Sequence, residues 1–202
     1  FEIWLRRLEA RVGSLVGNSG SFFAARRELC EMWHPDQSSD FFLALHAAKR
    51  GLRSVVDPEC QGRYGLVRSY KAELQRKVRT VVHGLDVLFT HRDLLNPVRY
   101  GLFSWQLVSH KLFRWLVPLG IFSLLVSNSL LWNAGSFYRL FLVLQVGLYG
   151  ACLLASVAGC WAGFKVLKPA SFFVLGNAAT VMAWLYFLSG EKFATWQPSE
   201  RL

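Results

Sequence analysis

Charged side chains are missing from three long stretches of the chain. No Asp, Glu, Lys or Arg occurs in residues 115–138, 140–164 or 169–190. Each stretch exceeds the roughly 20 apolar residues that a helix needs to cross a bilayer. Hydrophobic residues make up 53% of the 202 residues, more than a single water-soluble domain of this size would carry. This distribution predicts three transmembrane helices, at about 115–132, 138–160 and 169–189.

Motifs for disulfide and nucleic-acid chemistry are also missing. The cysteines at positions 30, 60, 152 and 160 show no C-x-x-C spacing, so we expect free thiols in a reducing compartment. No RNA- or DNA-binding motif accompanies the net charge of +10, so we expect no nucleic-acid partner. The basic excess instead suits anionic lipid headgroups and phosphate-bearing substrates, and we expect the lipid bilayer as a partner.

Short apolar runs around a glycine turn predict strands in the first part of the chain. Leu15-Val16 and Phe22 to Ala25 flank the turn from Gly17 to Gly20, which favours a strand–turn–strand or strand–turn–helix unit. Arg53 to Asp57 is typical of a short buried strand. We therefore expect strands among the helices of this region.

Asp40 stands at the start of a predicted helix, where an acid has two interpretations. Ser38, Ser39 and Asp40 precede an apolar helix expected over residues 41–50 and ended by Gly51. A carboxylate near a helix N-terminus is stabilised by the backbone dipole, so Asp40 can serve as a cap. The same carboxylate can act on a substrate, and the local sequence leaves both interpretations open.

A basic helix and an aromatic amphipathic segment come next. The helix expected from about Ser69 to Phe89 carries a cluster of basic side chains, namely Lys71, Arg76, Lys77 and Arg79. Such a run is usually a solvated or lipid-facing surface. Residues 93–114 are amphipathic and rich in aromatics, the composition of a helix that lies in the membrane interface.

Lysines in the second predicted turn set the expected topology. Lys165 and Lys168 lie between the second and third spans, whereas the first turn has only the adjacent Arg139. The positive-inside rule then places this loop and the basic N-terminal region on the cytosolic side. Parity places the tail from Glu191 outside. We expect a multi-pass protein of the plasma (inner) membrane.

The order of these motifs resembles the C-terminal portion of the membrane-bound family 2 glycosyltransferases, of the hyaluronan or cellulose synthase type. The resemblance rests on GNSGSFFAARREL, an acid heading an apolar helix, G-x-R-x-V-x-x-P-E, a basic R-K-x-R helix and NPVRYGLFSWQLVSHKLFRW before the apolar spans. It implies the C-terminal half of an α/β GT-A-like domain over residues 1–92. An interface helix over 93–114 and a transmembrane region over 115–202 would follow. The chain would then be a piece of a longer enzyme.

The resemblance implies a catalytic role for Asp40. This residue matches the family's catalytic acid, which acts as general base on the acceptor hydroxyl. Ser39 stands where the family commonly has a second acid, and this departure concerns the tuning of the base. The residues implied at the acceptor site are Gly20, Ser21, Arg26 and Arg27. For the two arginines, surface charge at a helix start is an equal interpretation.

The family's Q-x-x-R-W motif, which contacts the donor diphosphate and the acceptor, is matched only in part. Alignment on Gln75 places Val78 where the Arg should be. Alignment on Arg79 places Arg76 at the Gln and Thr80 at the Trp. We prefer the second alignment, because a guanidinium suits bidentate contact with phosphate. The expected donor-binding residues are therefore Arg76 and Arg79, with Gln75 beside them.

The function implied by the resemblance is an inverting transfer of a sugar from a nucleotide-sugar donor. The acceptor would be a glycan or a lipid-linked molecule at the cytosolic membrane face. A divalent metal, Mg or Mn, is implied for the whole enzyme, with its ligands in the preceding part, since no D-x-D occurs in these residues. The piece alone is therefore expected to be inactive.

Two other functions remain open at this stage. The chain can be a non-catalytic membrane anchor or subunit whose basic region binds anionic lipid or a partner. It can also be a degenerate transferase that keeps the fold without the activity, since Ser39 and Thr80 depart from the family pattern. Convergence of Asp40 with Arg76 and Arg79 would favour the enzyme over these alternatives.

Overall fold

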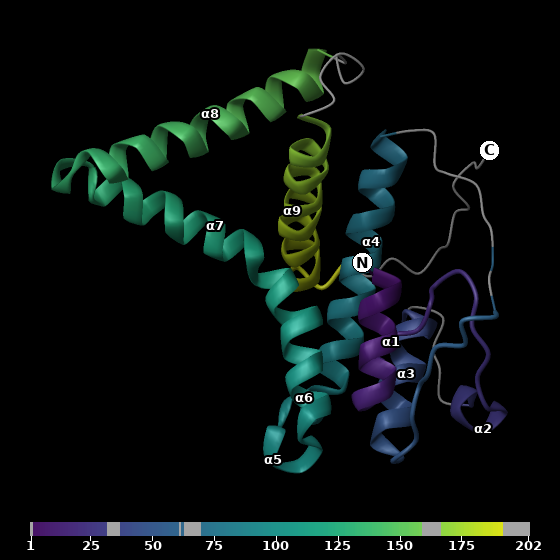
Figure 1. Cartoon of the computed structure of the whole chain (residues 1–202). Helices are drawn as coiled ribbons and strands as arrows, with labels where there is room; N and C mark the ends of the chain where they lie inside the picture. The colour runs from purple at the N-terminus through teal and green to yellow at the C-terminus, as the bar shows by residue number, and fades with distance from the viewer. Residues whose placement is uncertain (1, 32–36, 61, 63–69, 159–166, 192–202) are drawn as a thin grey trace. The chain divides into compact units, whose positions relative to one another are not determined.

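The structure is a computed structural model that describes residues 2–31, 37–60, 62, 70–158 and 167–191. Helices form all the regular secondary structure in these ranges (Figure 1). In chain order they are α1 (Glu2–Val12), α2 (Arg27–Cys30), α3 (Ser39–Lys49), α4 (Tyr70–Thr90), η1 (Arg92–Leu95), α5 (Pro97–Tyr100), α6 (Leu102–Leu107), η2 (Val108–Leu112), α7 (Phe113–Leu130), η3 (Trp132–Ala134), α8 (Ser136–Ala158) and α9 (Leu167–Leu188). Of the η elements, η2 is a π-helical turn.

The chain divides into two compact units. The first comprises Phe1–Trp115 together with Ala183–Leu202, and the second is Leu116–Met182. The first unit contains the glycine turn, Asp40 and the basic helix α4, so the residues expected to carry chemistry all belong to it.

The α/β class expected for the first unit is wrong, because the described residues contain no strand. Leu15 N donates to Ser54 O at 2.9 Å, and Ser54 N donates to Ser14 Oγ at 2.9 Å. A ladder needs repeated backbone pairing on both segments, and here one of the two bonds goes to a side chain. Val55 is 64% exposed, so this run is not the buried strand that its apolar composition predicts.

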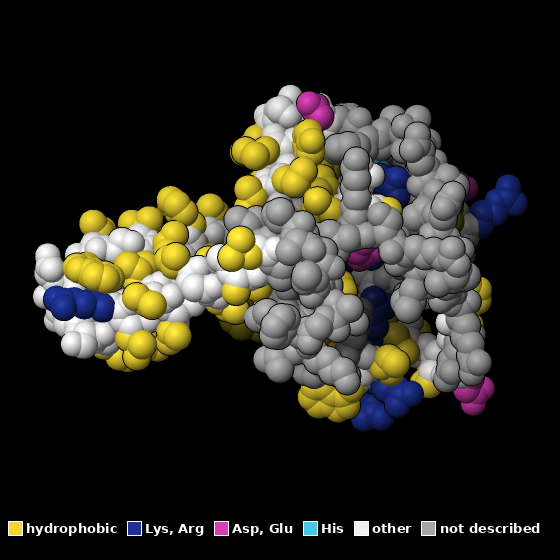
Figure 2. All heavy atoms as spheres, turned by 90° about the horizontal axis from the view of Figure 1, so that it is seen from above, with side chains coloured by type: hydrophobic (Ala, Val, Ile, Leu, Met, Phe, Trp, Pro, Cys, Tyr) yellow, Lys and Arg dark blue, Asp and Glu magenta, His cyan; other side chains and the backbone are white. Residues whose placement is uncertain are grey.

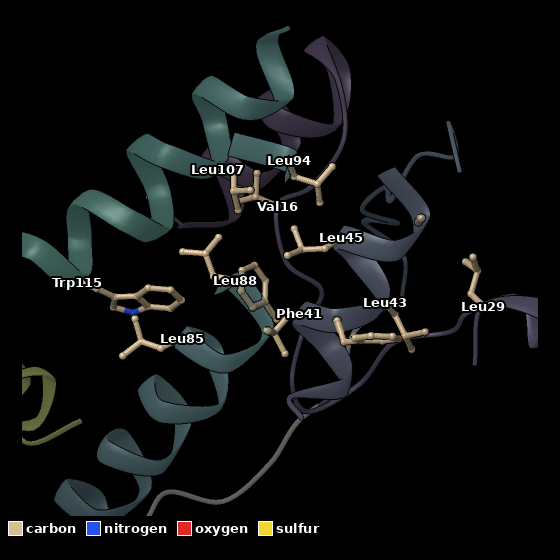
Figure 3. Packing of buried hydrophobic residues seen from close by; sticks show 13 residues of the cluster. Val16, Leu29, Phe41, Leu43, Leu45, Leu85, Leu88, Leu94, Leu107 and Trp115 are labelled. Carbon is tan, nitrogen blue, oxygen red and sulfur yellow. The ribbon is translucent and has the colours of Figure 1, made fainter. Parts of the chain in front are cut away.

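A cluster of aliphatic and aromatic side chains forms the core of the first unit (Figure 3). Helix α3 is central to it, with five consecutive residues buried from Phe41 to Leu45. Leu85 and Leu88 of α4 contribute from one side and Leu107 of α6 from another. Full burial of one such side chain stabilises a fold by about 1.5–3 kcal/mol, so α3 is the element on which this unit depends most.

Trp115 closes one end of this core. Gly84 of α4 makes room for it, since a Cβ built on Gly84 would lie 2.7 Å from Trp115 Cζ2. Trp184 Nε1 donates to Trp115 O at 3.0 Å. Phe89 and Phe187 stack with their ring centroids 5.1 Å apart. These aromatic contacts hold the start of α7 and the end of α9 within the first unit.

The second unit exposes an apolar surface. Figure 2 shows hydrophobic side chains spread over α7 and α8, and Phe122, Leu124, Phe141 and Val143 are among the exposed ones. The two helices are joined by polar contacts: Asn128 Nδ2 donates to Gln145 Oε1 at 3.4 Å, and Gln145 Nε2 donates to Ile121 O at 3.3 Å. Apolar side chains outside and amides inside are typical of helices in lipid.

One helical stretch in the described ranges, Leu102–Leu130, is long and apolar enough to cross a membrane. Its 29 residues span about 43 Å at a rise of 1.5 Å each, against a hydrocarbon core of about 30 Å. This helix supports association of the chain with a membrane. Shorter apolar stretches occupy Ser136–Cys152 and Phe172–Leu188. The multi-pass topology stays a prediction, and Lys165 lies outside the described residues.

Candidate functional site

A glycine turn packs against two charged side chains of the first unit. A Cβ built on Gly17 would lie 3.1 Å from Lys111 Nζ, and one built on Gly20 would lie 3.3 Å from Asp40 Oδ2. Asn18 N donates to Asp40 O at 3.2 Å and fixes the turn on the start of α3. Glycine at both positions therefore permits a close approach of backbone to a carboxylate and to an ammonium.

The Asp40 carboxylate is oriented by a neighbour in its own turn. Ser38 Oγ donates to Asp40 Oδ1 at 2.5 Å, which leaves Oδ2 toward Gly20. Ser38 is the N-cap residue of α3, and its side chain makes no capping hydrogen bond. Within the described ranges, the Asp40 carboxylate accepts from Ser38 and from no helix N–H. Asp40 is partly exposed, and its Oδ2 has no hydrogen-bond partner among the described residues.

Lys111, in the π-helical turn η2, faces the same turn. Its Nζ lies 4.8 Å from the centroid of the Phe41 ring, the residue that follows Asp40. The charges of Asp40, Arg114, Arg6 and Glu9 act on this ammonium. Cation, anion and exposed glycine backbone are thus assembled from the glycine turn, α3 and η2 on one face of the first unit.

Helix α1 borders this site through two sets of contacts. Arg53 Nε donates to Gly13 O at 2.7 Å, and its Nη2 donates to Ala10 O at 2.6 Å, so the guanidinium holds the C-terminal end of α1. Glu9 Oε1 is hydrogen-bonded to His110 Nδ1, the residue before Lys111. Together these contacts fix the position of α1 beside η2.

The predicted donor-binding residues lie on α4. Arg76 Nε and Nη2 donate to Glu73 at 2.9 and 2.7 Å, and this hydrogen bond holds the pKa of Glu73 below its usual range. Gln75 is exposed and Arg79 partly exposed. The described contacts do not join Arg79 to Asp40. The convergence of Asp40 with α4 that would favour an enzyme is therefore not among the observed contacts.

The remaining predicted acceptor-site residues have different surroundings. Gly20 contacts Asp40 as stated, and Ser21 beside it is exposed. Arg26 is the extended N-cap residue of α2, and Arg27 begins that helix; both are exposed. Their positions fit surface charge at a helix start as well as support of the acceptor site.

Lys111, Ser38 and the Glu9–His110 pair were not among the predicted site residues. The signal for Lys111 was its position as a cation in an aromatic segment that was interpreted as an interface helix. That segment is divided in the structure, since Gly101 has a φ of 54° and separates α5 from α6. Leu107, in its second half, is buried in the same core cluster as α3. Lys111 lies four residues further along the chain.

A metal site is not formed by the side chains that the structure describes, which offer no group of three or more His, Cys, Asp or Glu. What the site does offer is a carboxylate that can accept a proton and an ammonium that can bind an anion. Comparison of the chain with protein-family models, curated protein sequences and solved structures finds no match.

Proposed function

We propose that this chain takes part in sugar transfer at a membrane surface, with Asp40 as the general base. The donor is a nucleotide sugar and the acceptor a glycan or lipid-linked molecule, as in the family 2 glycosyltransferases that its motifs resemble. The observation that carries the proposal is the approach of Gly20 to Asp40 Oδ2, at 3.3 Å from a built Cβ. The two residues implied for acceptor binding and catalysis are thereby brought together.

The proposed chemistry sets a geometric requirement for Asp40. An inverting transfer needs a carboxylate within about 2.6–3.2 Å of the acceptor hydroxyl. The carboxylate takes the proton while the acceptor oxygen attacks the anomeric carbon. The bond from that carbon to the phosphate oxygen breaks, and the nucleoside diphosphate leaves with the electron pair. Ser38 holds Oδ1, so Oδ2 is the oxygen available for this proton.

Arg76 and Arg79 are proposed to stabilise the departing diphosphate, since guanidinium groups suit phosphate oxygens. To bind the diphosphate, Arg76 has to break its hydrogen bonds to Glu73 and donate to phosphate oxygens instead. The metal implied by the resemblance is expected to be held outside the described side chains, which offer no group of three or more His, Cys, Asp or Glu. No step of this proposal runs through a metal ion.

The position of Lys111 along the chain supports a reaction at the membrane surface. The helix Leu102–Leu130 is about nine residues longer than the roughly 20 needed to cross the hydrocarbon. With this excess at the N-terminal end, residues 102–110 reach beyond the hydrocarbon, and Lys111 follows them directly. Lys111, and Asp40 in the same unit, are therefore proposed to lie at headgroup depth. We propose the cytosolic face of the plasma membrane and a multi-pass topology, from the positive-inside rule.

The alternative is a membrane-bound subunit without activity, which includes a degenerate transferase. The pairing of Arg76 with Glu73 favours it, because a basic side chain engaged within its own helix is typical of a structural surface. In this case the basic side chains of α4 bind anionic lipid or a partner, and Asp40 has no chemical role.

The test measures nucleotide release from UDP-, GDP- and dTDP-sugars by the whole protein in membrane vesicles. Asp40→Asn keeps the shape of the side chain and removes the base, so release should fall by at least 100-fold, the scale of general-base catalysis being about 10²–10⁴. Asp57→Asn is the matched control, since Asp57 is exposed and accepts from Glu59 N alone in the described contacts. Release that survives Asp40→Asn removes Asp40 from the mechanism. Absence of release with every donor favours the inactive subunit.

A further inference from the structure

Lys111 Nζ has no hydrogen-bond acceptor among the residues that the structure describes. An ammonium carries three N–H groups. In the described part of the chain, the one partner of Lys111 Nζ is the face of the Phe41 ring, which accepts no ordinary hydrogen bond. The side chain is partly buried.

The nearby acids do not supply the missing acceptor. Asp40 and Glu9 act on Lys111 electrostatically, yet neither forms an ion pair with it in the described structure. Glu9 is engaged by His110, and Asp40 Oδ1 by Ser38. Arg6 and Arg114 add positive charge around the ammonium. The charges around Lys111 are therefore mixed, with two acids and two arginines, and neither acid is paired with the ammonium in the described structure.

The glycine turn lies close against this ammonium. A side chain at position 17 would begin 3.1 Å from Lys111 Nζ, where it would occupy space beside the donors. A side chain at position 20 would crowd the open oxygen of Asp40 in the same way. Both charged groups thus face a short stretch of backbone that carries no side chain at Gly17 or Gly20. A molecule lying along the turn would meet a base at one end and a cation at the other.

We infer that Lys111 binds a phosphate group of the substrate whose reacting hydroxyl or sugar lies at Asp40. This inference rests on the proposed function and names the chemistry of the group bound beside the base. Two sources present that chemistry at headgroup depth: the diphosphate of the nucleotide-sugar donor and the phosphate of a lipid-linked acceptor. An ammonium is a compact point charge that suits either one.

The experiment measures binding without turnover. It uses the whole protein with Asp40→Asn in phosphatidylcholine vesicles, so that neither arm depends on catalysis. One arm titrates UDP, and the other compares vesicles with and without polyprenyl phosphate. Lys111→Met should weaken one of the two by about tenfold, since a hydrogen bond to a charged group contributes about 1.5–3 kcal/mol. Lys111→Arg should restore most of the affinity, because it keeps the charge and the donors.

Two further variants separate phosphate binding from charge and from folding. Lys49→Met removes a cation that pairs with Asp93 at 2.7 Å, far along α3 from Asp40, and should leave both affinities unchanged. Gly17→Ala keeps the charge of Lys111 and crowds its Nζ, so it should weaken the same ligand as Lys111→Met.

Loss of UDP affinity identifies the donor diphosphate as the source, and loss of polyprenyl phosphate affinity identifies the acceptor. Unchanged affinity for both ligands in Lys111→Met overturns the inference, as does an equal loss in Lys49→Met. If nucleotide release depends on Asp40 while Lys111→Met binds normally, the proposed function stands and this inference fails. If release is absent and phosphate binding depends on Lys111, the proposed function fails and the assignment of Lys111 as a phosphate-binding residue stands.

Discussion

Glu9 of α1 and His110 of η2 are hydrogen-bonded across a separation of 101 residues. The Glu9 side chain is 8% exposed and that of His110 is 30% exposed. A buried carboxylate without a partner is costly, so this pair couples the position of α1 to that of η2. Because Lys111 follows His110 directly, the pair also contributes to placing the ammonium beside Gly17.

Loss of the Glu9 carboxylate should destabilise the first unit. Glu9→Ala removes the partner of His110 and should lower the free energy of unfolding by about 2 kcal/mol. Glu9→Gln keeps the shape and an acceptor oxygen, so the loss should be about half as large. Arg7→Ala, at an exposed position of the same helix, is the control. The measurement is urea unfolding in detergent micelles followed by circular dichroism. Equal midpoints for Glu9→Ala and Arg7→Ala would contradict the assignment.

Gly84 should tolerate no side chain. Its Cβ would lie 2.7 and 2.9 Å from two carbons of the buried Trp115 ring, which is not the flexible end of a side chain. Overpacking of this kind costs about 1–3 kcal/mol, so Gly84→Ala should lower the unfolding midpoint. Gly120→Ala is the matched control, because nothing lies within 4 Å of its built Cβ and alanine favours a helix. A Gly84→Ala protein as stable as wild type would show that Trp115 moves freely.

The helices of this fold were predicted correctly from the sequence, whereas the strands predicted from it are not present in the described residues. Periodicity and capping residues predicted helices near α3 and α4, since a helix satisfies its hydrogen bonds locally. A strand depends on a distant partner, which no local pattern reveals. Leu15 meets Ser54 through a single backbone bond, and Val55 is left exposed. The runs at Leu15-Val16 and at Arg53 to Asp57 do contain apolar residues, but the described residues form no β-ladder between them.

The site was predictable in part for the same reason. Gly20 and Asp40 were singled out from their order in the chain, and the structure brings them into contact. Lys111 was not singled out, because its place beside Gly17 depends on the break at Gly101 and on the burial of Leu107. Tertiary packing of this kind leaves only a weak signal in sequence.

Acidification should weaken the fold through His91. Burial lowers the pKa of this histidine below its usual value of 6.5, and its Nδ1 lies 3.0 Å from Val87 O. The unfolded chain takes up a proton near pH 6.5, while the native side chain stays neutral to lower pH. Stability is therefore fully present above pH 6.5 and is lost as the pH falls from there toward the folded pKa. His46, whose pKa burial also lowers, adds to the effect.

The measurement is the free energy of unfolding at several pH values from 7 to 5. His91→Gln should reduce the slope by up to about 1.4 kcal/mol per pH unit, the limit for one proton. The slope is compared rather than the stability itself, because the substitution also disturbs the contact with Phe42. An unchanged slope in His91→Gln would assign the acid sensitivity to other groups.

The helix Leu102–Leu130 should be protected by lipid rather than by protein. Leu124 is 53% exposed in the structure, and Val98 of α5, before this helix, is 94% exposed. In a variant whose native cysteines are replaced by alanine, Leu124→Cys and Val98→Cys are labelled in vesicles with a membrane-impermeant maleimide. The Leu124→Cys variant should react at least about tenfold more slowly, because its thiol lies in hydrocarbon that excludes the water-soluble reagent. Protection by the protein is too small to account for such a difference, since about half of the Leu124 side chain is free of it. Equal rates for the two variants would show that this helix does not enter the bilayer.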